Sequence, residues 1–167
     1  MGKIVTQFTI NAPAEVCFDL ARSIDLHELS TQQTGEKAIA GVTSGLINLG
    51  EVVTWRAKHF GIWQRLTSRI TEMDRPFYFV DEMVSGAFSY FHHEHSFQEN
   101  AQGTVMTDTF VYGTPLGILG RIFDRLVLEK YMQKLLLERN RVIKAVAESD
   151  QRLKSLKGLR PGSLHAF

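Results

Sequence analysis

The sequence lacks the features that mark several classes of protein. Cys17 is the only cysteine among 167 residues, so the chain cannot form an internal disulfide. The formal net charge is +1, which gives no general attraction to nucleic acid or to anionic membranes. No stretch approaches the roughly 18 apolar residues of a membrane span, and the opening segment MGKIVTQFTI has no apolar run like that of a signal peptide. We therefore expect a cytoplasmic protein with no membrane span and no nucleic-acid partner.

What remains is the composition of one globular domain with an apolar interior. Hydrophobic residues make up 44% of the chain and charged residues 22%, which is ordinary for a globular protein. There are 11 Phe against 4 Tyr and 2 Trp. Phenylalanine adds apolar volume without the hydrogen-bonding group of Tyr or Trp, so this excess favours a dense core or an apolar pocket.

Alternating apolar residues predict strands at the start and through the middle of the chain. The first is expected over Lys3–Ile10. Turn residues such as Gly61 and the Asn100–Gly103 segment separate the later ones. These later strands are expected over Gly35–Val42, Glu51–Phe60, Ile62–Met73, Phe77–Val84, Phe88–Glu99 and Thr104–Tyr112.

Helical spacing follows the first strand and the last one. Pro13 indicates the start of a short helix, with Asn11 as its expected cap. A second short helix is expected over Ile24–Ser30, and a long one from Leu116 to about Glu148. The apolar face of the long helix is wider than packing against a single neighbouring element requires. It indicates either a two-part buried helix or a stripe that faces a cavity.

The predicted elements require a cover for the apolar face of one antiparallel sheet. Only the long C-terminal helix is large enough. We therefore expect an α+β fold, in which a curved antiparallel sheet of about six or seven strands wraps around that helix, with two short helices after the first strand. Such a sheet leaves a cavity in front of the helix unless large side chains fill it. Residues 1–149 form this domain, and the basic segment 150–167 is predicted to be a flexible tail.

The strand that contains Phe91, His93, His95 and Phe97 has the most informative pattern. Side chains alternate along a strand, so these four share one face. An apolar wall with two imidazoles is unusual for a solid core and favours a lined cavity. We expect the two histidines to be polar groups of the pocket wall or partners of buried acids, with partial exposure at a sheet end as the alternative.

A metal site is a weaker interpretation of the same two histidines. It would need a third ligand, namely Asp81, Asp108 or His59. Because two histidines at this spacing are common in strands by chance, we predict no metal and no cofactor.

Asp81 and Asp108 alternate with apolar residues on their strands. A carboxylate on an inward face requires a partner, and a buried pair with His or Arg is structural in most proteins. Alternatively, such an acid anchors the polar end of a ligand or takes part in general acid–base chemistry. Because an imidazole titrates near neutral pH, a histidine is the natural proton carrier. The candidate catalytic residues are His93, His95 and Asp108.

The order of elements resembles the helix-grip fold of the START and birch-pollen-allergen superfamily, also called SRPBCC. The segments that carry the likeness are FTINAPAEV (residues 8–16), GTVMTD (103–108), Tyr112, PLG (115–117) and Arg139-Asn140. Those that look like the polyketide-cyclase-like bacterial branch are WRAKHFG (55–61), FVD (79–81) and HEHSF (93–97).

This resemblance implies a cavity for a small hydrophobic or amphipathic ligand. Members include lipid carriers, plant-hormone receptors, aromatase/cyclases and ring-hydroxylase subunits, so the fold does not fix the activity.

Ligand binding is the function that the sequence favours. The expected apolar wall is Trp55, Leu66, Phe79, Met83, Phe91, Phe97 and Phe110. The expected polar contacts are His59, Asp81, His93, His95 and Asp108. One alternative is a cyclase- or dehydratase-like enzyme in which His93 or His95 moves protons in the same cavity. A second is a structural or interaction module with a filled cavity. No motif specifies the ligand or the oligomeric state.

Overall fold

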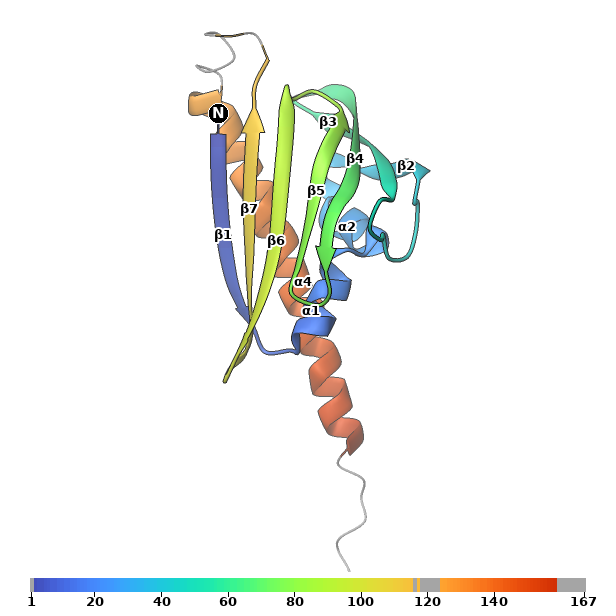
Figure 1. Cartoon of the computed structure of the whole chain (residues 1–167), viewed down its shortest axis with the longest axis vertical. Coiled ribbons are helices and arrows are strands. Elements are labelled where there is room, and N and C mark those ends of the chain that lie inside the picture. The colour runs from blue at the N-terminus through green and yellow to red at the C-terminus, as the bar shows by residue number, and fades with distance from the viewer. Residues whose placement is uncertain (1, 116, 118–123, 159–167) are drawn as a thin grey trace, which may run out of the picture.

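One antiparallel sheet organises the chain. The computed structural model describes residues 2–115, 117 and 124–158, and only the backbone of 124 and 150–158. The seven described strands are ordered β1-β7-β6-β5-β4-β3-β2 (Figure 1). They are β1 (Gly2–Ile10), β2 (Lys37–Gly41), β3 (Val52–His59), β4 (Ile62–Asp74), β5 (Tyr78–Ser85), β6 (Tyr90–Asn100) and β7 (Gly103–Gly113).

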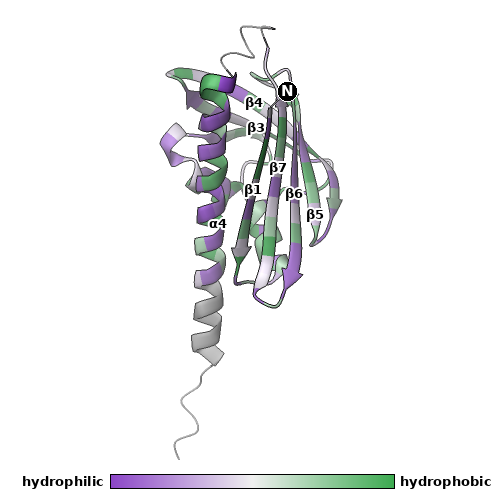
Figure 2. Ribbon diagram, turned by 90° about the vertical axis from the view of Figure 1, so that its left-hand side faces the viewer, coloured by the Kyte–Doolittle hydropathy of each residue, from purple (hydrophilic) through white to green (hydrophobic). Residues whose placement is uncertain are grey.

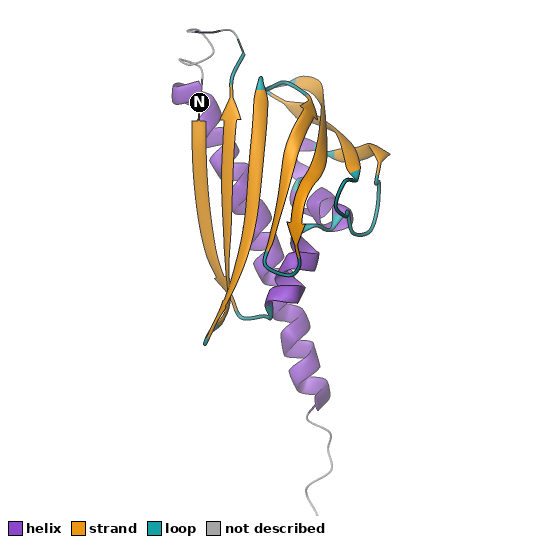
Figure 3. Ribbon diagram, viewed as in Figure 1, coloured by secondary structure: helices purple, strands orange, loops and turns teal. Residues whose placement is uncertain are grey.

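The helices lie on one face of this sheet (Figure 3). Between β1 and β2 come α1 (Ala14–Ala21), α2 (Ile24–Ser30) and a 3-10 turn, η1 (Gln32–Thr34). After β7 come a π-helical turn, η2 (Asp124–Leu128), and the long helix α4 (Glu129–Gly158). Figure 2 shows α4 along one side of the molecule, with β1, β7, β6 and β5 on the other side. The predicted α+β helix-grip architecture is confirmed. Among the described helices, none has the length and apolar character needed to cross a bilayer.

The C-terminal helix continues past its predicted end. Of the residues where it was expected to begin, 116 and 118–123 lie outside the described residues, whereas Gly117 is helical and η2 begins at Asp124. At the other end α4 continues to Gly158, past the boundary expected at residue 149. Its last turns project beyond the sheet (Figure 1). The first part of the predicted tail is therefore helical, and residues 159–167 of it lie outside the described residues.

The cap of α1 was predicted wrongly. Pro13, not Asn11, occupies the N-cap position, in an extended conformation with φ −61° and ψ 153°. The first helical N–H, that of Ala14, donates to the carboxylate of Glu99 at 3.2 Å. The N–H of Asn11 donates instead to the carboxylate of Glu148 at 3.1 Å. Spacing along the chain could not predict these partners, because they come from β6 and α4.

Two apolar clusters occupy the helix-facing side of the sheet. In the first, the ring of Phe18 from α1 packs edge-on against Phe79 and Phe97, with centroids 5.4 and 5.6 Å apart. The second contains Phe91 and Phe110, whose ring centroids are 5.4 Å apart. Along β6, the residues between Phe91 and Phe97 that face inward are histidines. A polar layer therefore separates two apolar ones.

Candidate functional site

The polar layer follows from strand register. Thr6 of β1 lies opposite Asp108 of β7, and Asp108 lies opposite His95 of β6. On the next strand, Asp81 of β5 lies opposite His93. Side chains at paired positions share one face of a sheet. Four strands thus bring these five side chains together on the face that meets α4.

Asp108 is the centre of this layer and is completely buried. Its carboxylate accepts a hydrogen bond from Nδ1 of His95 at 2.5 Å and one from Oγ1 of Thr6 at 3.4 Å. From α4, Nδ2 of Asn140 donates to the same carboxylate and to Oγ1 of Thr6. Nη1 of Arg139 lies 3.7 Å from it. Asp108 therefore connects the sheet to α4.

His95 lies between two carboxylates. Its Nδ1 contacts Asp108, and its Nε2 lies 3.1 Å from Oδ1 of Asp81. Its ring stacks on Phe79 with centroids 4.2 Å apart. Burial disfavours a charged imidazole, but the two carboxylates outweigh it and raise the pKa of His95. Burial likewise opposes ionisation of Asp108, yet His95 and the nearby donors hold the pKa of that carboxyl well below its usual range.

His93 has the opposite electrostatic character. Its Nδ1 lies 3.6 Å from Asp81, and its Nε2 lies 3.6 Å from Asp108. Burial, together with the charge of His95, lowers the pKa of His93 to about 4. At neutral pH His93 is therefore neutral, whereas the two carboxylates beside His95 favour its charged form. The carboxylates of Asp81 and Asp108 are then balanced by the cations of His95 and Arg139.

A cavity of about 590 Å³ opens in front of this layer, between the sheet and α4. We call Asp81, His93, His95 and Arg139, which all line it, the inner polar group. Nine of the twelve predicted ligand contacts lie on its wall. They are Trp55, His59, Leu66, Phe79, Asp81, Phe91, His93, His95 and Phe110.

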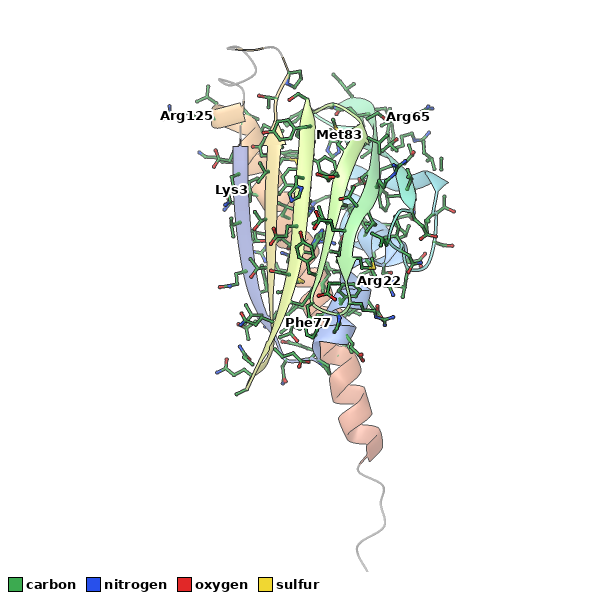
Figure 4. The ribbon with its side chains drawn as sticks, viewed as in Figure 1. Lys3, Arg22, Arg65, Phe77, Met83 and Arg125 are labelled. Atoms are coloured by element: carbon green, nitrogen blue, oxygen red, sulfur yellow. The ribbon has the colours of Figure 1, made fainter. Side chains whose placement is uncertain are left out.

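The other three predicted contacts lie away from the cavity wall. Asp108 is completely buried behind His95, to which it is hydrogen-bonded. Phe97 is covered by Phe18 of α1, which closes that end of the sheet. Met83 packs against the second apolar cluster. Figure 4 places it toward one end of β5, with Phe77 toward the other end.

A second set of polar side chains on the wall was not predicted as a group. It consists of His27 from α2, Glu36 from the loop before β2, His59 from β3 and Tyr131 from α4, and we call it the outer polar group. Nε2 of His27 lies 3.4 Å from Oε2 of Glu36. Nδ1 of His59 lies 2.8 Å from Oη of Tyr131. Of these four, only His59 was expected from the sequence.

Electrostatics couple the members of the outer polar group. Burial opposes the charge of Glu36, but the neighbouring His27 and His59 outweigh it and lower the pKa of the carboxyl. Burial lowers the pKa of His59, although Glu36 opposes this shift. Burial and the Glu36 charge together raise the pKa of Tyr131. The group is therefore a carboxylate whose neighbours are two imidazoles and a phenol.

Asp81, His93 and His95 are close enough to hold a metal ion, since one ligand atom of each lies within 4.8 Å of the others. However, both nitrogens of His95 already contact carboxylates. The charges of the layer also balance without an added cation. We therefore interpret this group as an ion-pair network.

The folded chain is expected to lose stability as pH falls from 6.5 toward 4. In the unfolded chain His93 takes up a proton near its ordinary pKa of 6.5, whereas in the fold it does so only near 4. In this window the unfolded state binds more protons, so stability decreases with falling pH by up to about 1.4 kcal/mol per unit. Burial of His59 adds a contribution of the same sign.

Urea denaturation at a series of pH values measures this slope. His93→Gln should reduce this slope by about 1.4 kcal/mol per pH unit, which is the contribution of one bound proton. His92→Gln, on the opposite face of β6, should leave it unchanged. An unaltered slope in His93→Gln would show that His93 is not the titrating group.

Solved structures with the same architecture come from bacteria and a plant. The protein TTHA0849 of Thermus thermophilus superposes with a TM-score of 0.68 at 17% identity, over 87% of this chain and 99% of that one. Ginseng (Panax ginseng) major latex-like protein 151 superposes with a TM-score of 0.64 at 18% identity, over 87% of this chain and 97% of that one. A START superfamily protein of Mycobacterium smegmatis superposes with a TM-score of 0.66 at 11% identity, over 88% of this chain and 97% of that one.

No family model and no curated protein matches the sequence. The chain has the helix-grip fold that the resemblance of its segments to the SRPBCC, or START-like, superfamily implied. At these identities the likeness is one of fold, so the function has to be argued from the cavity.

Proposed function

We propose that this protein binds a small hydrophobic or amphipathic molecule in the cavity between the sheet and α4. The observation that carries the proposal is the cavity itself. Its volume of about 590 Å³ falls within the range of ligand pockets, roughly 300–1,000 Å³. Its wall combines apolar side chains with a few convergent polar groups, which is the usual composition of such sites.

The inner polar group supports the proposal through two unpaired nitrogens. Nε2 of His93 and Nη1 of Arg139 are buried and have no hydrogen-bond partner within bonding distance. An unpaired buried donor costs about 1–3 kcal/mol. Since both residues line the cavity, an oxygen of the ligand can supply the missing acceptor. The ligand's polar end is therefore expected at Arg139 and His93.

Native mass spectrometry of protein purified from its own host tests the proposal. We expect a co-purifying small molecule at one per chain, released when the protein unfolds. The same sample, after the molecule is removed, should bind a neutral apolar fluorescent probe such as N-phenyl-1-naphthylamine at one site. Repeated isolation of an empty protein that also fails to bind the probe would refute ligand binding.

A cyclase- or dehydratase-like enzyme is the second candidate. The contact between His93 and Asp81, both on the wall of an open cavity, favours it. A neutral imidazole next to a carboxylate can accept a proton from a bound substrate. His93→Gln should then abolish turnover of a polyketide-like chain and leave its binding measurable. Turnover that persists in this variant would exclude His93 as the base.

The third function expected from the sequence, a structural module with a filled interior, has less support. A cavity of this volume is the opposite of the packed interior that this function requires.

A further inference from the structure

The cavity has a polar group at each end of one helical stripe. Tyr131, Leu135 and Arg139 of α4 all line it, and their spacing of four residues places them on the same face of the helix. Tyr131 belongs to the outer polar group and Arg139 to the inner one. At 1.5 Å per residue, the eight residues between them span about 12 Å. Leu135 lies between the two polar ends.

The wall between the two groups is apolar on both layers. On α4, Met132 and Leu136 lie beside Leu135. On the sheet, Trp55 of β3 and Leu66 of β4 are paired in register and also line the cavity. A ligand with one polar head would place hydrocarbon against either the inner or the outer polar group. Desolvating a polar group without a hydrogen bond is unfavourable, so such a ligand fits only half of the wall.

The inner end offers hydrogen-bond donors. Nη1 of Arg139 and Nε2 of His93 make no hydrogen bond and lie 3.7 and 3.6 Å from Oδ1 of Asp108. Nη2 of Arg139 is fixed by the carbonyl of Ala21 at 2.7 Å. The two carboxylates and two cations of the layer already balance. A neutral acceptor, such as a carbonyl oxygen, therefore suits this end better than an anion.

The outer end offers an acceptor. The side chain of Glu36 is only 12% exposed, and Nε2 of His27 lies 3.4 Å from its Oε2. His27 and Thr31 are hydrogen-bonding neighbours that help to lower the pKa of this carboxyl, and its remaining lone pairs can accept a further donor. The hydroxyl of Tyr131 is oriented by His59 at 2.8 Å. A carboxylate and a phenol oxygen in this position can receive a hydrogen bond from a hydroxyl or amine of the ligand.

We infer that the ligand is an elongated apolar molecule with a neutral carbonyl at its inner end and a hydroxyl or amine about 12 Å away at its outer end. This inference rests on the proposed ligand-binding function and adds the chemical class of the ligand. Glu36 and Tyr131 select for the second polar group.

Two matched probes test it: methyl decanoate and methyl ω-hydroxydecanoate, measured by isothermal titration calorimetry. In a purely apolar pocket the added hydroxyl weakens binding, because it loses its water without gaining a partner. With Glu36 and Tyr131 as partners, we expect the hydroxylated ester to bind about tenfold more tightly. Tyr131→Phe and Glu36→Gln should each reduce this ratio to about threefold or less.

Tyr90→Phe makes the same chemical change at an exposed position outside the cavity wall and should preserve the ratio. Thermal unfolding of each variant establishes that it is folded, and either Tyr131→Phe or Glu36→Gln suffices for the test. If the wild-type protein binds both esters with equal affinity, the inference fails while ligand binding stands. If it binds neither ester nor the fluorescent probe, both the inference and the proposed function fail.

Discussion

Replacing Asp108 with alanine will lower the free energy of unfolding by about 3–5 kcal/mol, the range measured when one partner of a buried ion pair is removed. Asp108 is completely buried and accepts hydrogen bonds from His95, Thr6 and Asn140. Its loss leaves the cation of His95 with Asp81 as its only carboxylate contact in the described part of the chain. It also removes the acceptor that connects α4 to β7. Urea denaturation at neutral pH measures the change.

Two further variants separate the charge of Asp108 from its general effect. Asp108→Asn keeps an oxygen acceptor for Asn140 but loses the charge opposite His95, so it should be destabilised less than Asp108→Ala. Asp74→Ala, at an exposed position at the end of β4, should change stability by less than about 0.5 kcal/mol. If Asp108→Ala were no more destabilised than Asp74→Ala, the polar layer would not hold the sheet to α4.

The inward faces of the strands were predictable because they depend only on local alternation. Along β6, Phe91, His93, His95 and Phe97 are buried, and the residues between them are more exposed. The period of two does not depend on what the strand pairs with. The same reasoning placed Trp55 and Phe79 on the cavity wall, where the structure has them.

The partners of those residues were not predictable in the same way, because pairing depends on register. Asp108 meets His95 and Asp81 meets His93 because of the lengths of the turns between β5, β6 and β7. A shift of one residue would have turned one acid to the other face. The sequence could therefore supply both acids as candidates, but not their pairing or the position of Asp108 behind His95.

The outer polar group shows a further limit. Tyr131 and Arg139 stand eight residues apart in α4, a spacing that places two residues on one face of a helix. Glu36 falls within the strand expected over Gly35–Val42, but β2 begins only at Lys37, and Glu36 lies in the loop between η1 and β2. Its contact with His27 depends on how α2 packs over β3, where His27 stacks on Trp55 with centroids 4.2 Å apart. Such a contact exists only after tertiary packing.

A bulky side chain on the cavity floor should weaken ligand binding strongly. Ala57 of β3 is 4% exposed, lines the cavity and lies between Trp55 and His59 on the inward face. Its methyl group leaves room that the ring of Ala57→Phe would occupy. Excluding about 100 Å² of the ligand's apolar surface from the wall costs about 2.5 kcal/mol, which weakens binding by about 70-fold. Titration of the fluorescent probe or of methyl decanoate measures the loss.

The position of the substitution, rather than its size, decides this outcome. Because the new ring enters empty space, overpacking should cost Ala57→Phe no more than about 1–3 kcal/mol of stability, and the variant remains folded. Ala40→Phe adds the same ring to the exposed face of β2 and should bind as the wild type does. If Ala57→Phe is folded and retains wild-type affinity, the ligand does not occupy the space between β3 and α4. Binding would then have to take place on another surface of the molecule.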